Sequence, residues 1–245
     1  MFFIKRGWEE TMLKNKVIMI TGASGGMGQV LCEELAAQGA KLVLASRKEE
    51  TLKEQCDLLK GKYSVEVMGC ALDVTKEDQV KEFVERAGET YGKIDALVNL
   101  AGLSIPGKIA ETDEAVYDLM MDVNVKGVYL MAKYFTQYAA ADARIINMGS
   151  MAARRTNANA PVYCMAKSAL NVLSQGLSLQ LAEKGIHVTT LNPGGADTPF
   201  WGDRPVKREK LLQAQDIVDV IMFVLSSNPR IVIHSVDFES IQMVG

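Results

Sequence analysis

The stretch that decides the fold is Val17-Ile18-Met19-Ile20-Thr21-Gly22-Ala23-Ser24-Gly25-Gly26-Met27-Gly28, an apolar run that leads directly into a glycine-rich loop. A helical pattern follows over Gln29–Gln38, and a second apolar run begins at Lys41. In such a strand–loop–helix unit, glycines allow a tight turn, and N–H groups at the helix start can bind a pyrophosphate. The pattern favours a dinucleotide site over a plain strand–helix turn or another phosphate ligand. No Gly-Lys-Ser/Thr closes the loop, which disfavours a nucleoside-triphosphate P-loop.

Outward from this stretch, the chain repeats the alternation of short apolar runs and helical patterns. Because most runs are apolar throughout, we expect strands that are buried on both faces of a parallel sheet. The sequence therefore predicts a single-domain, Rossmann-like doubly wound α/β fold, with a seven-stranded parallel sheet and helices on both faces. The expected strands are Val17–Ile20, Lys41–Ala45, Val65–Leu72, Ile94–Asn99, Arg144–Met148, His187–Leu191 and Ile231–Phe238, and the expected helices include Gln29–Gln38, Gln79–Tyr91, Glu111–Val128 and Tyr129–Tyr138.

The composition argues against several classes of protein. With 27 Lys and Arg against 30 Asp and Glu, the net charge of −3 offers no basic surface for nucleic acid. No run approaches the ~20 apolar residues that a membrane helix requires, so we expect a cytoplasmic protein without a membrane partner. Two histidines argue against a metal site, and four widely spaced cysteines are expected to be free thiols.

The ends of the expected domain follow from the same alternation. Residues 1–14 are expected to form an N-terminal extension, and residues 15–245 the Rossmann-like domain. Within it, the segment of about 195–210 breaks the alternation and contains Pro199, Gly202 and Pro205. This segment is expected to be a substrate loop over a site.

The second expected strand ends in Ser46-Arg47 rather than in an acidic residue. An acidic side chain here would bind the ribose hydroxyls of NAD, whereas an arginine can bind a 2′-phosphate and stack on adenine. Arg47 therefore favours NADP(H) over NAD(H), and the alternative is a solvated arginine at the start of a helix. After the third strand, Asp73 and Val74 are expected beside the adenine, where Asp73 can also cap a helix that begins at Thr75.

Tyr163 and Lys167 are four residues apart in a segment of helical character, so they share one helix face. A free tyrosine has a pKa near ~10 and is a poor acid–base catalyst at neutral pH. A neighbouring cation stabilises tyrosinate and lowers that pKa. Ser150 precedes this pair and can donate a hydrogen bond to a carbonyl oxygen at the same point. The alternative for Tyr163 is a half-buried core aromatic.

Together these motifs resemble the short-chain dehydrogenase/reductase family, and the resemblance covers almost all of residues 15–225. The family pattern TGxxxGxG is matched by the loop after the first strand, and its Asn-Asn-Ala-Gly by Asn99-Leu100-Ala101-Gly102. The family's other motif residues are matched by Asn124, Ser150, Tyr163, Lys167, Pro193, Gly194 and Thr198, the last of which corresponds to the threonine that usually holds the nicotinamide carboxamide.

The resemblance implies an NADP(H)-dependent oxidoreductase that transfers a hydride between nicotinamide and a carbonyl or secondary alcohol. Tyr163 would be the general acid–base, and Ser150 would orient the substrate oxygen. Lys167 would bind the nicotinamide ribose and lower the pKa of Tyr163, and Asn124 would support a water that connects Lys167 to solvent. The implied cofactor-binding residues are Thr21, Gly22, Ser24, Gly26, Met27, Gly28, Ser46, Arg47, Asp73, Val74, Asn99, Ala101, Gly102, Tyr163, Lys167, Pro193, Gly194 and Thr198.

The chain also departs from the family pattern. Leu100 replaces the second asparagine of Asn-Asn-Ala-Gly, for which we expect a local repacking, and Gly149 replaces a common serine, for which we expect a small loss. No basic residue stands beside Ser24, so the choice of cofactor depends mainly on Arg47. The segment Val236–Ile241 lacks the glycines that many members carry after the last strand. A homodimer or a homotetramer is expected, and this absence makes the tetramer the more doubtful of the two.

The substrate is less well defined by the sequence. The expected pocket contains Arg154, Arg155 and Arg204 beside apolar side chains, which is compatible with a 3-oxoacyl or 3-hydroxy acid substrate. Those arginines could instead face solvent or a subunit contact. An alternative function is a catalytically weak nucleotide-binding sensor or scaffold with the same fold, which the intact set of Asn124, Ser150, Tyr163 and Lys167 disfavours.

Overall fold

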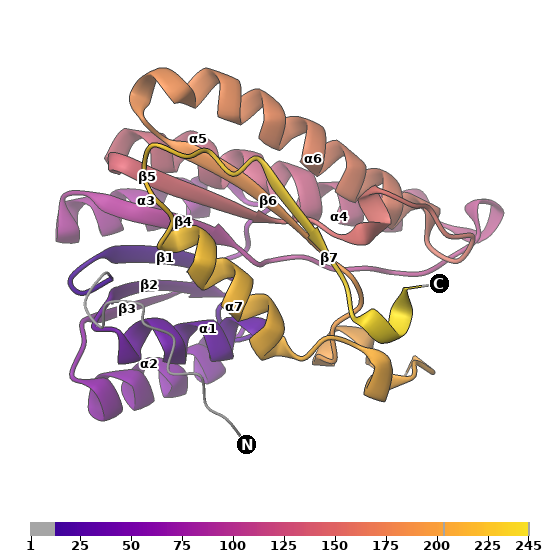
Figure 1. Cartoon of the computed structure of the whole chain (residues 1–245), viewed down its shortest axis with the longest axis horizontal. Coiled ribbons are helices and arrows are strands. Elements are labelled where there is room, and N and C mark those ends of the chain that lie inside the picture. Colours follow the sequence, from indigo (N-terminus) through magenta and orange to yellow (C-terminus); the bar gives the residue numbers. More distant parts are fainter. Residues whose placement is uncertain (1–12, 203, 245) are drawn as a thin grey trace.

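The computed structural model describes residues 13–202 and 204–244, and in them seven strands form one sheet (Figure 1). The strand order is β3-β2-β1-β4-β5-β6-β7, and every pairing is parallel. This confirms the expected single Rossmann-like domain. The strands are β1 (Val17–Thr21), β2 (Lys41–Ser46), β3 (Val67–Ala71), β4 (Ile94–Asn99), β5 (Ala139–Met148), β6 (His187–Pro193) and β7 (Ser235–Phe238).

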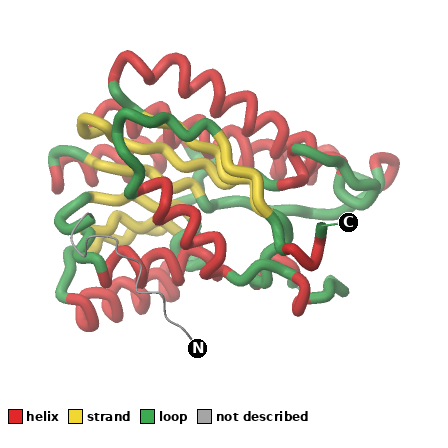
Figure 2. Tube along the Cα trace, viewed as in Figure 1, coloured by secondary structure: helices red, strands yellow, loops and turns green. Residues whose placement is uncertain are grey.

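Helices cover both faces of the sheet, as Figure 2 shows. The core on one face is formed with α1 (Gly26–Ala37), α2 (Glu49–Tyr63) and α7 (Ala214–Leu225). The core on the other face is formed with α3 (Glu77–Tyr91), α5 (Gly127–Tyr138) and α6 (Pro161–Leu181), and α4 (Glu114–Met121) leads towards α5.

Strand β1 explains why the deciding stretch is apolar at every position. Successive side chains of a strand point to opposite faces of the sheet. Ile18 and Ile20 therefore lie in one core, whereas Val17 and Met19 lie in the other. All four side chains are buried. An alternating apolar–polar pattern would have left one face of the sheet without a core.

The glycine loop begins with a close contact between β1 and the segment after β4. Gly22 has a φ of +69°, which glycine adopts most readily, and an added Cβ would lie 2.8 Å from the backbone nitrogen of Ala101. The N–H of Leu100 donates to the carbonyl of Thr21 at 3.2 Å. Strand order reverses between β1 and β4, and ligands of doubly wound sheets bind at such a reversal.

The last strand is shorter than the sequence suggests. The expected strand Ile231–Phe238 is wrong at its start, because β7 begins at Ser235. Before that point the Thr189 hydroxyl donates to the carbonyl of Ile233 at 2.6 Å. At Ile233 the contact with β6 is therefore a hydrogen bond from a side chain and not the backbone pairing of two strands. Strand β5, by contrast, is longer than expected. It begins at Ala139 rather than at Arg144, and its pairing with β4 has a register irregularity between these two residues.

The expected helix Glu111–Val128 is also corrected. A 3-10 turn ends at Glu111, and α4 begins only at Glu114. A π-helical turn, η2 (Asp122–Lys126), then joins α4 to α5. The sequence pattern does not distinguish such a turn from a regular helix.

Two further expectations concern Asp73 and the N-terminal extension. Helix α3 begins at Glu77, and Asp73 instead caps the preceding turn, where its Oδ1 accepts from the N–H and hydroxyl of Thr75 at 3.0 and 2.8 Å. Of the expected N-terminal extension, residues 1–12 lie outside the described residues. Leu13 is buried in the core between the sheet and α1.

Two helical glycines give a test of this packing. An added Cβ at Gly88 in α3 would lie 2.1–2.5 Å from ring atoms of Tyr138, whereas Gly61 in α2 has nothing within 4 Å. Gly88→Ala is expected to lower the free energy of unfolding by about 1–2 kcal/mol through overpacking. Gly61→Ala, the matched control, is expected to raise it by about 1 kcal/mol through helix propensity. Urea unfolding measures both, and equal effects would contradict the packing of α3 on α5.

Candidate active site

Two adjoining cavities lie at the carboxyl ends of the strands. The larger, about 830 Å³, is lined by Ser150, Tyr163 and Lys167. The smaller, about 440 Å³, is lined by the glycine loop, Arg47 and Asp73. Both are lined by a shared set of residues, which are Met27, Leu100, Gly102, Thr198 and Phe200. One elongated ligand can therefore extend from the smaller cavity into the larger.

The cofactor residues expected from the sequence gather here, with two exceptions. Pro193 and Gly194 line the larger cavity. Thr21 and Asn99 line neither and lie buried behind the loop. The smaller cavity is lined by Gly22, Ser24, Gly26, Met27, Gly28, Ser46, Arg47, Asp73, Val74, Ala101, Gly102 and Thr198.

The glycine loop and the start of α1 pack too tightly to admit a side chain at Gly28. An added Cβ at Gly28 would lie 2.4 Å from the carbonyl oxygen of Gly22. The hydroxyls of Ser24 and Ser46 are hydrogen-bonded to each other, which joins the loop to the end of β2. Helix α1 begins at Gly26, so its N-terminus faces the smaller cavity with free N–H groups and a positive dipole end.

Asn99 belongs to a buried polar chain beneath the loop. Its Nδ2 donates to Asn147 Oδ1 at 2.9 Å, and Asn147 Nδ2 donates to Ser174 Oγ at 2.9 Å. Asn99 Oδ1 has no hydrogen-bond partner among the described residues. Thr21 is nearby in the fold, and its Oγ1 accepts from the N–H of Ala101 at 3.3 Å.

At the tip of β2, Arg47 is exposed and lines the smaller cavity together with Asp73. Burial acts to raise the pKa of Asp73, but hydrogen bonds from Thr75 and the charges of Lys76 and Arg47 lower it overall. Asp73 is therefore an ionised acceptor at neutral pH. The charge of Arg47 is felt at Asp73, so the two side chains lie near each other.

The larger cavity contains the serine, tyrosine and lysine expected from the sequence. Ser150 follows β5, and Tyr163 and Lys167 lie one turn apart on α6. Lys167 Nζ lies 5.7 Å from the centroid of the Tyr163 ring and donates to the carbonyl of Met148 at 2.8 Å. The α6 turn thus brings the phenol and the ammonium group to the end of β5.

The electrostatics of this cluster differ from the expectation. Burial raises the pKa of Tyr163 to about 12, although a hydrogen bond with Ser150 and the charge of Arg204 oppose the increase. Burial also lowers the pKa of Lys167 to about 8. The expected lowering of the Tyr163 pKa is therefore not seen among the protein's own groups, because desolvation outweighs the hydrogen bond with Ser150 and the charge of Arg204. Tyr163 carries its proton at neutral pH.

Asn124 is held in the π-helical turn η2. Its Nδ2 donates to the carbonyls of Met120 and Leu103, each at 2.9 Å. An added Cβ at Gly102 would lie 3.1 Å from Asn124 Oδ1 and 3.5 Å from Lys167 Nζ. The π turn therefore presents this asparagine to the lysine across Gly102, and π turns are frequent at functional sites.

The loop after β6 contributes aromatic side chains and one cation to the larger cavity. The rings of Phe200 and Tyr163 are 6.1 Å apart. The Arg204 guanidinium lies 5.2 Å from the Phe200 centroid and 4.9 Å from that of Trp201, and it donates to the carbonyls of both residues. Arg204 has no carboxylate partner among the described residues.

The other two arginines that the sequence analysis placed in the pocket are paired with carboxylates. Arg154 pairs with Asp237 through its Nε and Nη2 at 2.8 and 3.2 Å, and Arg155 pairs with Glu239. Arg154 does not line the larger cavity. Sequence reasoning could not foresee these pairs, because they join residues more than eighty positions apart.

Asn171 and Asn192 lie beside this cluster and were not predicted from the sequence. Asn192 directly precedes the Pro193-Gly194 turn and is 0% exposed. Its Oδ1 accepts from the N–H of Ser150 at 3.1 Å. The available signal was an asparagine between an expected strand and the Pro193-Gly194 turn, since a buried amide requires partners.

Comparisons with known proteins agree with this architecture. The family model described as short chain dehydrogenase matches residues 16–209. An uncharacterized oxidoreductase of Staphylococcus saprophyticus is 34% identical over 226 residues, which are 91% of this chain and 97% of the relative. An uncharacterized oxidoreductase of Staphylococcus aureus strain MRSA252 is 31% identical over 228 residues, with 92% and 97% covered.

Solved structures are similar over nearly the whole chain. An alcohol dehydrogenase from the archaeon Thermococcus sibiricus, complexed with 5-hydroxy-NADP, has a TM-score of 0.87 at 27% identity, with 95% of this chain and 99% of that chain covered. A blue fluorescent protein from a metagenomic library, complexed with NADPH, has a TM-score of 0.87 at 26% identity and the same coverage.

Within the described residues, no helix has both the length and the apolar character to cross a membrane. The family model covers most of the chain, and the relatives match almost from end to end. The sheet, the paired cavities and these matches together show that the chain belongs to the short-chain dehydrogenase/reductase family and is an oxidoreductase.

Proposed function

We propose that this protein is an NADP(H)-dependent oxidoreductase that transfers a hydride between nicotinamide and a carbonyl or secondary alcohol carbon. The observation that carries the proposal is the junction of the two cavities, where Tyr163, Ser150 and Lys167 adjoin the glycine loop. In this proposal residues 15–245 form the catalytic domain, and the loop of about 195–210 covers the substrate.

The chain offers groups that fit a nicotinamide dinucleotide. The tightly packed glycine loop and the α1 N-terminus suit a pyrophosphate. Arg47 would hold a 2′-phosphate, Asp73 and Val74 the adenine, and Thr198 the carboxamide. The bound nicotinamide supplies or accepts the hydride, and the protein supplies orientation and electrostatics.

NADP(H) rather than NAD(H) is favoured by Arg47. A guanidinium offers paired N–H donors to a phosphate, and β2 ends without an acidic residue for ribose hydroxyls. Solved relatives add support, because the Thermococcus enzyme is complexed with 5-hydroxy-NADP and a short chain dehydrogenase from Burkholderia cenocepacia, 25% identical, with NADP.

In the reductive direction Tyr163 would donate the proton to the substrate oxygen. Its raised pKa keeps the phenol protonated at neutral pH, as an acid requires. Ser150 would hold that oxygen beside the phenol. Lys167, with a pKa of about 8, is still mainly charged at neutral pH and would stabilise the tyrosinate that forms. Asn124, close to Lys167, would support the water through which the proton returns.

Arg204 supports a substrate with an acidic group, such as a 3-oxo or 3-hydroxy acid. It lines the larger cavity, its charge is felt at Tyr163, and only backbone carbonyls and aromatic rings contact it among the described residues. A substrate carboxylate would give this half-buried cation a charged partner.

A homodimer is proposed on the apolar residues that α6 exposes. Val172 and Leu179 are 68% and 79% exposed on this helix, and Met165 on the same helix is also exposed. Exposed apolar patches of this kind mark association sites.

The first test removes the phenol oxygen. Tyr163→Phe is expected to lower kcat by at least about 100-fold, because the general acid is lost while the ring remains. The measurement is loss of NADPH absorbance with ketones and 3-oxo acids, and Tyr63→Phe, on α2 and outside both cavities, is the control. Undiminished turnover in Tyr163→Phe would exclude the mechanism. A wild-type protein that binds NADPH but reduces none of these carbonyls would instead favour the sensor or scaffold.

The second test concerns the cofactor. Arg47→Asp is expected to reduce the preference for NADPH over NADH at least about tenfold, since it removes charge-assisted bonds to the 2′-phosphate. Fluorescence titration gives both dissociation constants. Lys53→Asp makes the same charge change on the exposed side of α2 and should leave the ratio as it is. An unchanged ratio in Arg47→Asp removes this residue from the role.

The third test concerns the substrate. Arg204→Ala is expected to raise KM for a 3-oxo acid about tenfold more than KM for its methyl ester, because only the acid has a charge to lose. Steady-state kinetics on the two compounds decide this. Lys207→Ala, on the same loop but outside the cavity lining, is the control. An equal change for acid and ester would show that Arg204 does not read the charge.

A further inference from the structure

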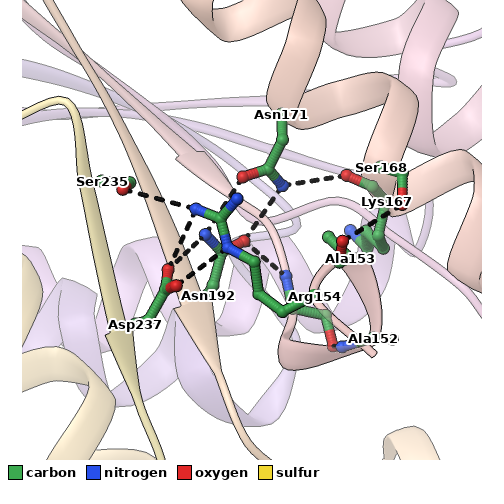
Figure 3. A network of polar contacts seen from close by, with 10 residues as sticks. Ala152, Ala153, Arg154, Lys167, Ser168, Asn171, Asn192, Ser235 and Asp237 are labelled. Atoms are coloured by element: carbon green, nitrogen blue, oxygen red, sulfur yellow. Dashed lines mark hydrogen bonds and ion pairs between the residues drawn. The ribbon is translucent and has the colours of Figure 1, made fainter. Parts of the chain in front are cut away.

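A polar network, buried at Asn171 and Asn192 and partly exposed at Arg154 and Asp237, connects the last strand to the loop that carries Ser150 (Figure 3). We propose that Asn192 and Asn171, held by Asp237 and Arg154, are positioning residues that set Ser150 and Lys167 for the reaction. This inference rests on the proposed function, because it concerns side chains to which that function assigns roles. None of the four residues lines either cavity, so they act through others.

Asn192 makes all the hydrogen bonds that its amide allows. Its Oδ1 accepts from the N–H of Ser150 at 3.1 Å and from Asn171 Nδ2 at 3.0 Å. Its Nδ2 donates to Asn171 Oδ1 at 3.1 Å and to Asp237 Oδ1 at 2.8 Å. A fully satisfied buried amide is held in one orientation, because every other rotation leaves buried groups unpaired.

The orientation of this amide is fixed by chemistry as well as by packing. A backbone N–H can only donate, so the atom facing Ser150 must be the oxygen. An ionised carboxylate can only accept, so the atom facing Asp237 must be the nitrogen. Burial acts to raise the pKa of Asp237, but hydrogen bonds from Arg154 and Asn192 lower it overall, so the carboxylate is ionised.

Two branches of the network end at the proposed catalytic groups. One is the direct bond to the N–H of Ser150, at the point where β5 ends. The other passes through Asn171, whose Nδ2 also donates to the carbonyl of Lys167 at 2.9 Å. Lys167 is thereby held at its backbone by Asn171 and at its ammonium group by the carbonyl of Met148.

Arg154 closes the network into a ring. It lies four residues after Ser150 and pairs with Asp237 at 2.8 Å, and it also reaches Ser235 Oγ at 3.4 Å. The loop from Ser150 to Arg154 is therefore held at both ends, by Asn192 on β6 and by Asp237 on β7. Neither end of the loop can move without breaking a bond to the sheet.

The close approach of Asn192 to the backbone requires that residue 149 has no side chain, and Gly149 meets this requirement. An added Cβ there would lie 2.1 Å from Asn192 Oδ1. From the sequence, only a small loss was expected from glycine at this position. The contact shows instead that glycine is what allows the Asn192 amide to reach the backbone of Ser150.

The experiment reverses the polarity of one hydrogen bond. Asn192→Asp places a second carboxylate against Asp237, and Asp237→Asn in the same chain restores a donor opposite an acceptor. We expect Asn192→Asp to lower kcat about tenfold to hundredfold, with a much smaller change in the NADPH dissociation constant. The double variant is expected to recover at least about tenfold of that loss. Its recovery is incomplete, because Asn171 Oδ1 then lacks its donor.

Arg154, at the partly exposed end of the network, gives a second measurement if Asn192→Asp fails to fold. Arg154→Ala is expected to lower kcat about tenfold with little change in thermal midpoint, because a partly exposed ion pair contributes little stability. Arg154→Lys should restore part of the rate. Lys62→Ala, which removes an exposed ion pair with Glu33 on the far helices, is the control.

The outcomes separate the two proposals. If Tyr163→Phe is inactive while folded Asn192→Asp and Arg154→Ala retain the wild-type kcat, only the positioning network is overturned. A double variant as slow as Asn192→Asp also overturns it. If Tyr163→Phe keeps full activity, the proposed function fails and the network proposal fails with it.

Discussion

The contact of Gly22 with the backbone of Ala101 is the constraint on which the other features of the site depend. It fixes the end of β1 against the end of β4, where the strand order of the sheet reverses. From this point the glycine loop turns towards α1 on one side, and the segment after β4 turns towards Asn124 on the other. The smaller cavity opens between these two turns, and the larger one continues it along β5 and β6.

The carboxyl ends of the central strands pose a second physical problem, because polar side chains are buried there. Amide groups solve it, since each can donate and accept at once. Asn99 and Asn147 form one buried chain, and Asn171 and Asn192 form another. The second chain contacts two of the proposed catalytic groups, at the N–H of Ser150 and the carbonyl of Lys167. Their surroundings are thus polar and ordered, while Tyr163 and Lys167 are desolvated enough to shift both pKa values.

Much of this could be predicted from the sequence where local patterns decide the outcome. The apolar run before Thr21 predicted β1, and the spacing of Tyr163 and Lys167 placed them on one face of α6. What could not be predicted depends on contacts between distant segments. The pairing of Arg154 with Asp237, the space at Gly149 and the late start of β7 arise only when β5, β6 and β7 lie side by side. Burial raises the pKa of Tyr163 where the sequence predicted that it is lowered, because the spacing of residues along the chain does not report how far a side chain is desolvated.

Strand β7 is the last strand along the described chain, yet Asp237 on it holds the loop that begins at Ser150. During synthesis, a ribosome will have released the glycine loop, Tyr163 and Lys167 long before Asp237 emerges. The loop that begins at Ser150 can therefore be held at both ends only after the last strand has been made and has joined the sheet.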